Sequence, residues 1–124
     1  MIRNTLLAAL IFLSLQSCYD IVEEDISDQS LELLAPFNGA ELTDTEVTFR
    51  WSDVEGISGY ELLVVKPDFD RIEKVVIDST LTDERFNYEL LPGVYEWRVR
   101  AFNSASELMS DIFRLEVVAS PEQE

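Results

Sequence analysis

The sequence contains no histidine and only one cysteine, Cys18, among its 124 residues. It therefore lacks imidazole, which is the most frequent general base near neutral pH and a common metal ligand. A single thiol cannot form a disulfide within one chain, so a folded domain has to be stabilised by its apolar core. No nucleophile–base pair and no cofactor motif is present either. We therefore predict a protein that is not an enzyme, and we assign it no metal-ligating residue and no bound cofactor.

Basic residues are scarce as well. Nine lysines and arginines stand against 25 aspartates and glutamates, which gives a formal net charge of −16 at pH 7. Such an excess of negative charge keeps a protein soluble and repels phosphate backbones and anionic lipid headgroups. Nucleic acid is therefore excluded as the expected partner.

Two pairs of carboxylates are the only candidates for chemistry. Asp53 with Glu55, and Asp68 with Asp70, are each two positions apart within predicted loops. The carboxylates of a glycosidase need a set separation across a cleft, whereas neighbours in sequence usually belong to solvated turns. The spacing of an EF-hand is absent. We interpret both pairs as turn residues, with a weak calcium site in these loops left open.

No apolar run is long enough to cross a bilayer as a helix. The longest, residues 6–15, follows Arg3 and has the length of the apolar part of a secretory signal peptide, which is about ten residues. An uncleaved anchor would need a longer run. A plain secretory signal would favour small residues at both flanking sites and would leave a free thiol at Cys18.

The end of this run resembles the lipobox of bacterial lipoproteins, with Leu15-Gln16-Ser17 directly before Cys18. The resemblance implies that residues 1–17 are a cleaved lipoprotein signal peptide. It also implies that Cys18 carries a covalent diacylglycerol and an acyl chain, such as palmitate, and that this lipid binds the protein to a membrane.

Residues 18–30 are expected to form the lipidated cysteine and an acidic linker. Residues 19–30 contain five acids, Asp20, Glu23, Glu24, Asp25 and Asp28. A segment of this composition buries too little apolar surface to offset its ordering entropy, so we predict a solvated spacer. Glu23-Glu24-Asp25 also resembles the acidic export signal of Bacteroidota surface lipoproteins. That resemblance implies an outer-membrane lipoprotein in the cell envelope, exposed at the cell surface.

Residues 31–118 carry short alternating apolar runs separated by turn signals, which is typical of an all-β sandwich. In residues 94–102 the alternation directs Tyr95, Trp97, Val99 and Ala101 to one face. Residues 119–124 are a short tail. The expected strands are seven, at residues 31–35, 46–51, 60–66, 72–78, 85–91, 94–102 and 111–118.

The order of these residues is similar to that of fibronectin type III domains. Trp51 closes the second expected strand and Tyr60 opens the third. Leu91-Pro92-Gly93-Val94-Tyr95 then precedes the run that begins at Trp97. The resemblance implies a seven-stranded antiparallel immunoglobulin-like sandwich with Trp51, Tyr60, Tyr95 and Trp97 in its core. It also implies a tyrosine corner, in which the Tyr95 hydroxyl bonds to backbone. Asn103-Ser104-Ala105-Ser106 departs from the family because it lacks the usual glycine.

Two functions from different classes remain open. The first is a lipid-anchored interaction module that presents the sandwich to a protein partner. The second is a glycan-binding accessory lipoprotein of an outer-membrane polysaccharide-uptake system. Aromatic side chains at predicted turns or on outward faces could contact a sugar, although single exposed aromatics are common on protein surfaces. These candidate ligand contacts are Phe37, Phe69 and Phe102, with Tyr88 as a further exposed aromatic.

Overall fold

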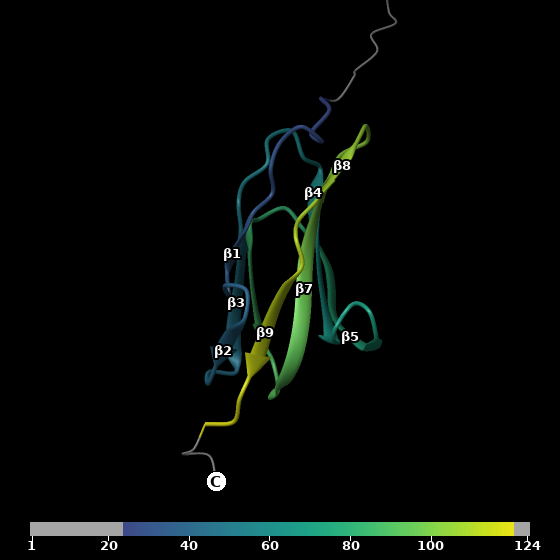
Figure 1. Ribbon diagram of the computed structural model, residues 1–124. Coiled ribbons are helices and arrows are strands. Elements are labelled where there is room, and N and C mark those ends of the chain that lie inside the picture. Colours follow the sequence, from purple (N-terminus) through teal and green to yellow (C-terminus); the bar gives the residue numbers. More distant parts are fainter. Residues whose placement is uncertain (1–23, 121–124) are drawn as a thin grey trace, which may run out of the picture.

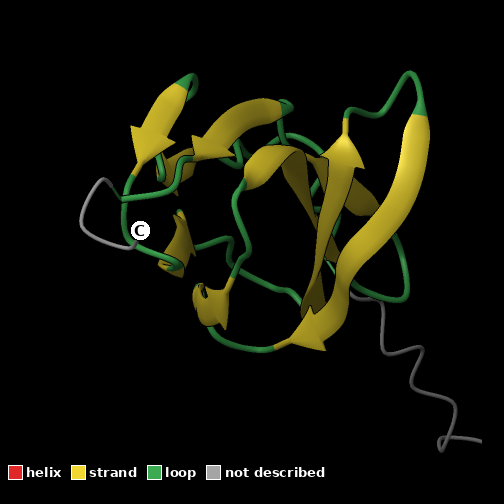
Figure 2. Cartoon of the chain, turned by 90° about the horizontal axis from the view of Figure 1, so that it is seen from below, coloured by secondary structure: helices red, strands yellow, loops and turns green. Residues whose placement is uncertain are grey.

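The computed structural model describes residues 24–120, which form two packed β-sheets and contain no helix (Figures 1 and 2). The smaller sheet has the strand order β1-β3-β6, and the larger has the order β2-β9-β7-β4-β5 with β8 paired to β7. The strands are β1 (Leu33–Ala35), β2 (Ala40–Leu42), β3 (Glu46–Trp51), β4 (Gly59–Pro67), β5 (Ile72–Leu81), β6 (Arg85–Glu89), β7 (Gly93–Phe102), β8 (Glu107–Met109) and β9 (Phe113–Val117).

The all-β prediction is confirmed, while the expected seven antiparallel strands are corrected in two respects. The described residues contain nine strands, and the two additional ones, β2 and β8, have three residues each. Three residues are too few for an alternating pattern to be recognised in the sequence. In addition, β2 pairs with β9 in parallel, because the chain crosses from the smaller to the larger sheet between β1 and β2.

The core between the sheets contains all four aromatic residues assigned to it from the sequence. Trp51, Tyr60, Tyr95 and Trp97 are each at most 2% exposed. Trp51 packs edge-on against Tyr60 at 5.7 Å, and Trp97 packs edge-on against Phe49 at 4.9 Å. Such pairs contribute about 0.5–1.5 kcal/mol beyond their burial. The two indole N–H groups have no acceptor among the described residues, so this core relies on ring packing rather than on polar contacts.

Residues 24–30 lie on the sandwich, so the predicted solvated spacer does not extend over them. Ile26 is fully buried in the core, and its N–H donates to the Ser106 Oγ at 2.9 Å. The side chain of Gln29 exchanges two hydrogen bonds with the backbone of Glu55. One buried isoleucine and these hydrogen bonds anchor the segment, although its acidic composition gives no periodic signal. Cys18, the expected lipidation site, lies outside the described residues.

Candidate functional site

The aromatic residues proposed to contact a ligand do not form one surface. Phe37 is 69% exposed in the link between β1 and β2, at one edge of the larger sheet. Phe69 lies in the link before β5, at the opposite edge, half-buried beneath the guanidinium of Arg98 at 4.7 Å. Phe102 ends β7 and lies beneath Arg100 at 4.6 Å. Two of the three rings therefore already have a cation over one face.

One member of each carboxylate pair accepts a hydrogen bond at its loop, and the bond of Asp68 is the turn contact expected from the sequence. The Asp68 Oδ1 accepts the backbone N–H of Arg71 at 2.8 Å. The Asp53 Oδ1 lies 3.3 Å from the hydroxyl of Tyr60. Among residues 24–120, no three acidic or thiol side chains are grouped so that they could hold a metal ion.

Two buried tyrosines have hydroxyls with defined partners. The Tyr95 hydroxyl donates to the carbonyl of Leu91 at 2.6 Å, which is the bond that a tyrosine corner requires. The Tyr60 hydroxyl accepts the N–H of Val54 at 3.0 Å and lies 3.3 Å from the Glu84 Oε1. Burial raises the pKa of both phenols, and that of Tyr60 to about 12. Both hydroxyls thus serve as hydrogen-bonding groups within the folded domain.

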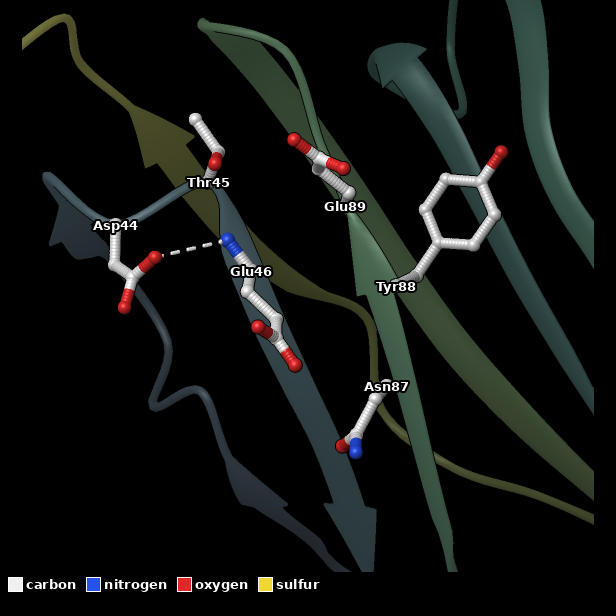
Figure 3. A pocket seen from close by; sticks show the side chains of 6 residues that line it. All are labelled: Asp44, Thr45, Glu46, Asn87, Tyr88 and Glu89. Atoms are coloured by element: carbon white, nitrogen blue, oxygen red, sulfur yellow. Dashed lines mark hydrogen bonds between the residues drawn. The ribbon is translucent and has the colours of Figure 1, made fainter.

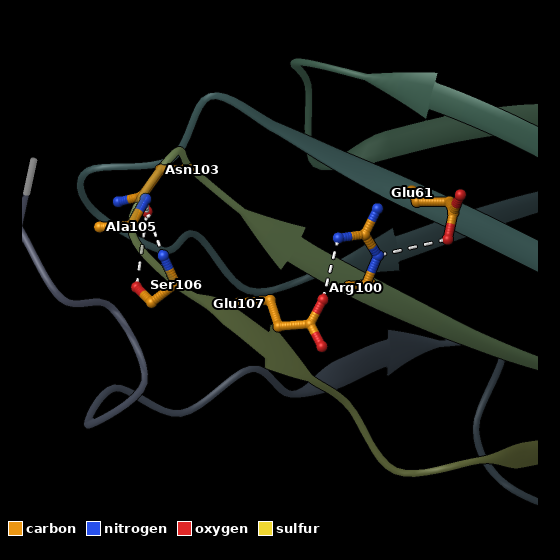
Figure 4. Close-up of polar contacts among 6 residues, drawn as sticks. All are labelled: Glu61, Arg100, Asn103, Ala105, Ser106 and Glu107. Atoms are coloured by element: carbon orange, nitrogen blue, oxygen red, sulfur yellow. Dashed lines mark hydrogen bonds and ion pairs between the residues drawn. The ribbon is translucent and has the colours of Figure 1, made fainter.

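One end of the sandwich holds the segment that leads towards Cys18. The side-chain amide of Asn103 donates to the carbonyls of Glu24 and Gly56, at 2.7 and 2.9 Å. Its oxygen accepts the N–H groups of Ala105 and Ser106 (Figure 4). The Asn103 side chain therefore closes the turn at residues 103–106, which lacks the glycine usual in fibronectin type III domains. The same side chain binds the segment that begins at Glu24.

Charged side chains reinforce this end. Arg100 contacts the Glu61 carboxylate at 3.4 Å and that of Glu107 at 3.1 Å, across three neighbouring strands of the larger sheet (Figure 4). Hydrogen bonds from the hydroxyl and the N–H of Ser27 lower the pKa of Asp25.

We call this region the tether end, defined by residues 24–30, 53–58 and 103–106. In Figure 1 it lies opposite the end at which β9 finishes.

An open groove with an apolar floor, bounded by strand edges, lies on the side of the sandwich where β1 leaves β3. β1 pairs with β3 only at Trp51 and Arg50, and Pro36 then carries the chain towards the larger sheet. Proline has no N–H to donate to a ladder, so pairing ends there. Within the described residues, no strand pairs with β3 residues 46–49 on this side.

We call this cavity the β3-edge groove; its volume is about 410 Å³. Its floor includes the buried side chains of Pro36 and Val47 and the half-buried Leu42. The complete lining is Ala35, Pro36, Glu41, Leu42, Thr43, Asp44, Glu46, Val47 and Thr48. The groove thus has an apolar floor, three carboxylates and no basic residue.

The backbone of β3 directs hydrogen-bonding groups into this groove. The carbonyl of Thr45 and the N–H of Trp51 both bond towards β6, whereas the N–H of Ser52 bonds towards β1. Because these directions alternate along a strand, Thr48 directs its N–H and carbonyl away from β6 and into the groove. The Glu46 N–H is already bound by the Asp44 Oδ1 at 3.0 Å (Figure 3).

Like charges face one another on both sides of the groove. Glu46 pairs directly with Glu89 across β3 and β6, and Glu41 pairs with Glu116 across β2 and β9. Like charges directly opposite one another destabilise a sheet. In Figure 3 the carboxylates of Glu46 and Glu89 point away from each other. The region therefore repels anions, and a cation bound there would relieve the repulsion.

Sequence reasoning found neither this groove nor the contact of Ile26. Pro36 was the one signal for the groove, since a proline after so short a strand leaves the neighbouring edge unpaired.

In residues 24–120 the structure contains no helix that is long and apolar enough to span a membrane.

Comparison with known proteins finds similarity at the level of structure only. No protein-family model and no curated protein matches the sequence. Fibronectin(III)-like modules of Clostridium thermocellum CbhA are 14% identical, with a TM-score of 0.46 over 73% of this chain and 98% of that one. The domain FN3tt is 16% identical, with a TM-score of 0.46 over 74% and 97%.

A third similar structure is the fibronectin type-III domain of human fibronectin type III domain containing protein 3. It is 18% identical, with a TM-score of 0.49 over 87% of this chain and 99% of that one. All three neighbours are fibronectin type III domains, but their TM-scores lie below 0.5 and are too low to support a family assignment for this chain. The sandwich assignment rests on the strand order and the core described above.

Proposed function

We propose that this protein is a lipid-anchored interaction module of the bacterial cell envelope, in which Cys18 carries the lipid and a sandwich of the fibronectin type III kind binds a protein partner. The anchor is supported by Leu15-Gln16-Ser17-Cys18 at the end of a short apolar run. Glu23-Glu24-Asp25 supports placement in the outer membrane, exposed at the cell surface. No catalytic role is proposed.

The observation that carries the proposal is the way residues 24–30 are fixed to residues 53–58 and 103–106 within the tether end. Glu24 is bound by Asn103, and Ile26 is buried in the core. Only six residue steps separate Cys18 from Glu24, and they span at most about 22 Å in any conformation. A lipid on Cys18 would therefore hold the tether end next to the membrane and the opposite end away from it. A short connection to a fixed orientation suits a domain that presents one surface to a partner.

The glycan-binding alternative receives less support from the structure. A sugar ring stacks on an accessible aromatic face, and binding would be favoured by two or more such faces on one surface. Phe37 and Phe69 belong to opposite edges of the larger sheet, and arginines cover Phe69 and Phe102. Phe37, Phe69 and Phe102 thus provide no shared platform, and Tyr88 lies apart from them on β6, where its ring stacks on Phe86 at 6.2 Å.

Metabolic labelling with an alkyne-bearing fatty acid tests the anchor in the native host. The wild-type protein should be labelled and should fractionate with membranes, and mass spectrometry should place the modification on Cys18. The Cys18→Ser variant should remain an unlabelled precursor, whereas the control Ser17→Ala, which keeps a small residue before the cysteine, should be processed normally. An unmodified Cys18 in the membrane fraction of wild-type cells would refute the proposal.

A further inference from the structure

We propose, resting on the proposed function, that the β3-edge groove takes an extended basic segment of the partner protein, which adds as a strand to the unpaired edge of β3. Three independent features of the groove lead to this occupant. They are the free backbone groups, the apolar floor and the charge of the rim.

The backbone of β3 is prepared for strand addition. Thr48 directs its N–H and its carbonyl into the groove, and no described strand pairs with residues 46–49 there. An extended peptide beside β3 would exchange main-chain hydrogen bonds with Thr48, as an added strand does at an exposed sheet edge. The opposite wall is β2, itself the edge strand of the larger sheet. A peptide in the groove would therefore lie between two strand edges rather than on a flat face.

The side chains of β3 dictate an alternating pattern for the occupant. Val47 faces the core, whereas Glu46 and Thr48 face outward. A residue opposite Val47 would point inward towards Pro36 and Leu42, and an apolar side chain fits that position. The residues on either side of it would point outward, next to Glu46. The occupant should therefore alternate apolar and charged residues.

Charge complementarity sets the sign of that charge. Glu41, Asp44 and Glu46 line the groove, and no basic residue does. Lysine or arginine at the outward positions of the occupant would relieve the repulsion between Glu46 and Glu89. A second copy of this chain is disfavoured, because pairing two such edges would bring two acidic rims together in a protein of net charge −16.

Fluorescence anisotropy with synthetic peptides tests the proposal on the full chain in a neutral detergent. The basic probe is Lys-Val-Lys-Val-Lys-Val-Lys, and the controls are the same peptide with every backbone nitrogen methylated and an acidic peptide with glutamate replacing each lysine. The basic probe should bind with a Kd below about 1 mM, and methylation should weaken it at least about tenfold, since it removes main-chain hydrogen bonds. The acidic peptide should not bind.

Matched protein variants separate the groove from general attraction to an acidic protein. Glu46→Lys should weaken the basic probe at least about tenfold, whereas the same charge reversal at Glu73, exposed on β5, should weaken it less than about threefold. Thr48→Pro removes the N–H that faces the groove and no bond to β6, so it should also abolish strand addition. If Thr48→Pro fails to fold, the methylated probe tests the same hydrogen bonds on the wild-type chain.

Several results would overturn this inference. They are absence of binding by the basic probe, equal losses in Glu46→Lys and Glu73→Lys, and unchanged binding of the methylated probe. Dimerisation of the wild type that Thr48→Pro abolishes would instead assign the edge to a second copy. Normal lipid labelling of Cys18 beside any of these results would leave the proposed anchor standing.

Discussion

Replacing Ile26 with alanine should destabilise the whole domain, although the residue precedes the first strand by seven positions. Its side chain is fully buried, and the substitution removes three carbons from the core. At about 0.8 kcal/mol per buried methylene the loss of transfer energy is about 2.4 kcal/mol. The cavity adds to that, so we expect a total of about 3 kcal/mol. For a domain of this size, the melting temperature should fall by at least about 12 °C.

Equilibrium unfolding in urea measures this loss, with Asp28→Ala as the matched control, because Asp28 is exposed in the same segment. Native-state hydrogen exchange adds a local measurement. The N–H of Ile26 bonds to Ser106, and the N–H of Glu55 bonds to Gln29, so both amides should exchange faster in Ile26→Ala. If Ile26→Ala and Asp28→Ala unfold at the same urea concentration as the wild type, then residues 24–30 are a spacer and the orientation argued for the anchored domain is lost.

Three further outcomes follow from the core and its buried phenols. Tyr95→Phe should cost about 0.5–3 kcal/mol in urea unfolding and Tyr88→Phe almost nothing, because only the Tyr95 hydroxyl donates to a backbone carbonyl; equal small effects would remove the tyrosine corner. Gly59→Ala places its Cβ 3.1 Å from an aromatic ring and should cost about 1–3 kcal/mol, whereas Gly93→Ala meets ordinary contacts at 3.5 Å and should melt like the wild type. In the folded chain the pKa of Tyr60 is raised to about 12, so above pH 10 the unfolded chain loses this proton first. The urea concentration at the unfolding midpoint should therefore fall as the pH rises from 10 towards 12. A Tyr60→Phe variant whose midpoint falls equally steeply over this pH range would contradict this.

The fold class could be predicted because its signal is local. In β7 each second residue from Tyr95 to Ala101 is buried, and the alternation along the chain is sufficient to show it. The same holds for β3, where Val47, Phe49 and Trp51 face the core. The Tyr95 corner was predicted through the resemblance to fibronectin type III domains, and its bond joins groups only four positions apart, the Tyr95 hydroxyl and the Leu91 carbonyl.

The ligand-contact residues show where such reasoning stops. Phe69 and Phe102 stand at predicted turns or outward positions, and each has an aromatic ring that could stack on a sugar. Whether an aromatic face is free depends on what lies over it, and here Arg98 and Arg100 lie over both rings. Arg100 and Phe102 are two positions apart on β7, but no sequence pattern specifies that Arg98, 29 positions from Phe69, will cover that ring, because the fold alone brings the link between β4 and β5 beside β7.

By itself, then, the sequence determined the all-β architecture and the inward-facing aromatic core, since each depends on residues close together in the chain; lipid attachment at Cys18 stays a prediction from the same kind of local pattern. Only the tertiary structure decided that Ile26 belongs to the core, that β2 runs parallel to β9, and that β3 keeps an unpaired edge. The physical reason is the separation of the partners. Ile26 meets Ser106 across 80 positions, and β2 meets β9 across about as many. A strand edge is left free only by the path that the rest of the chain takes around it, and that path is a property of the folded molecule.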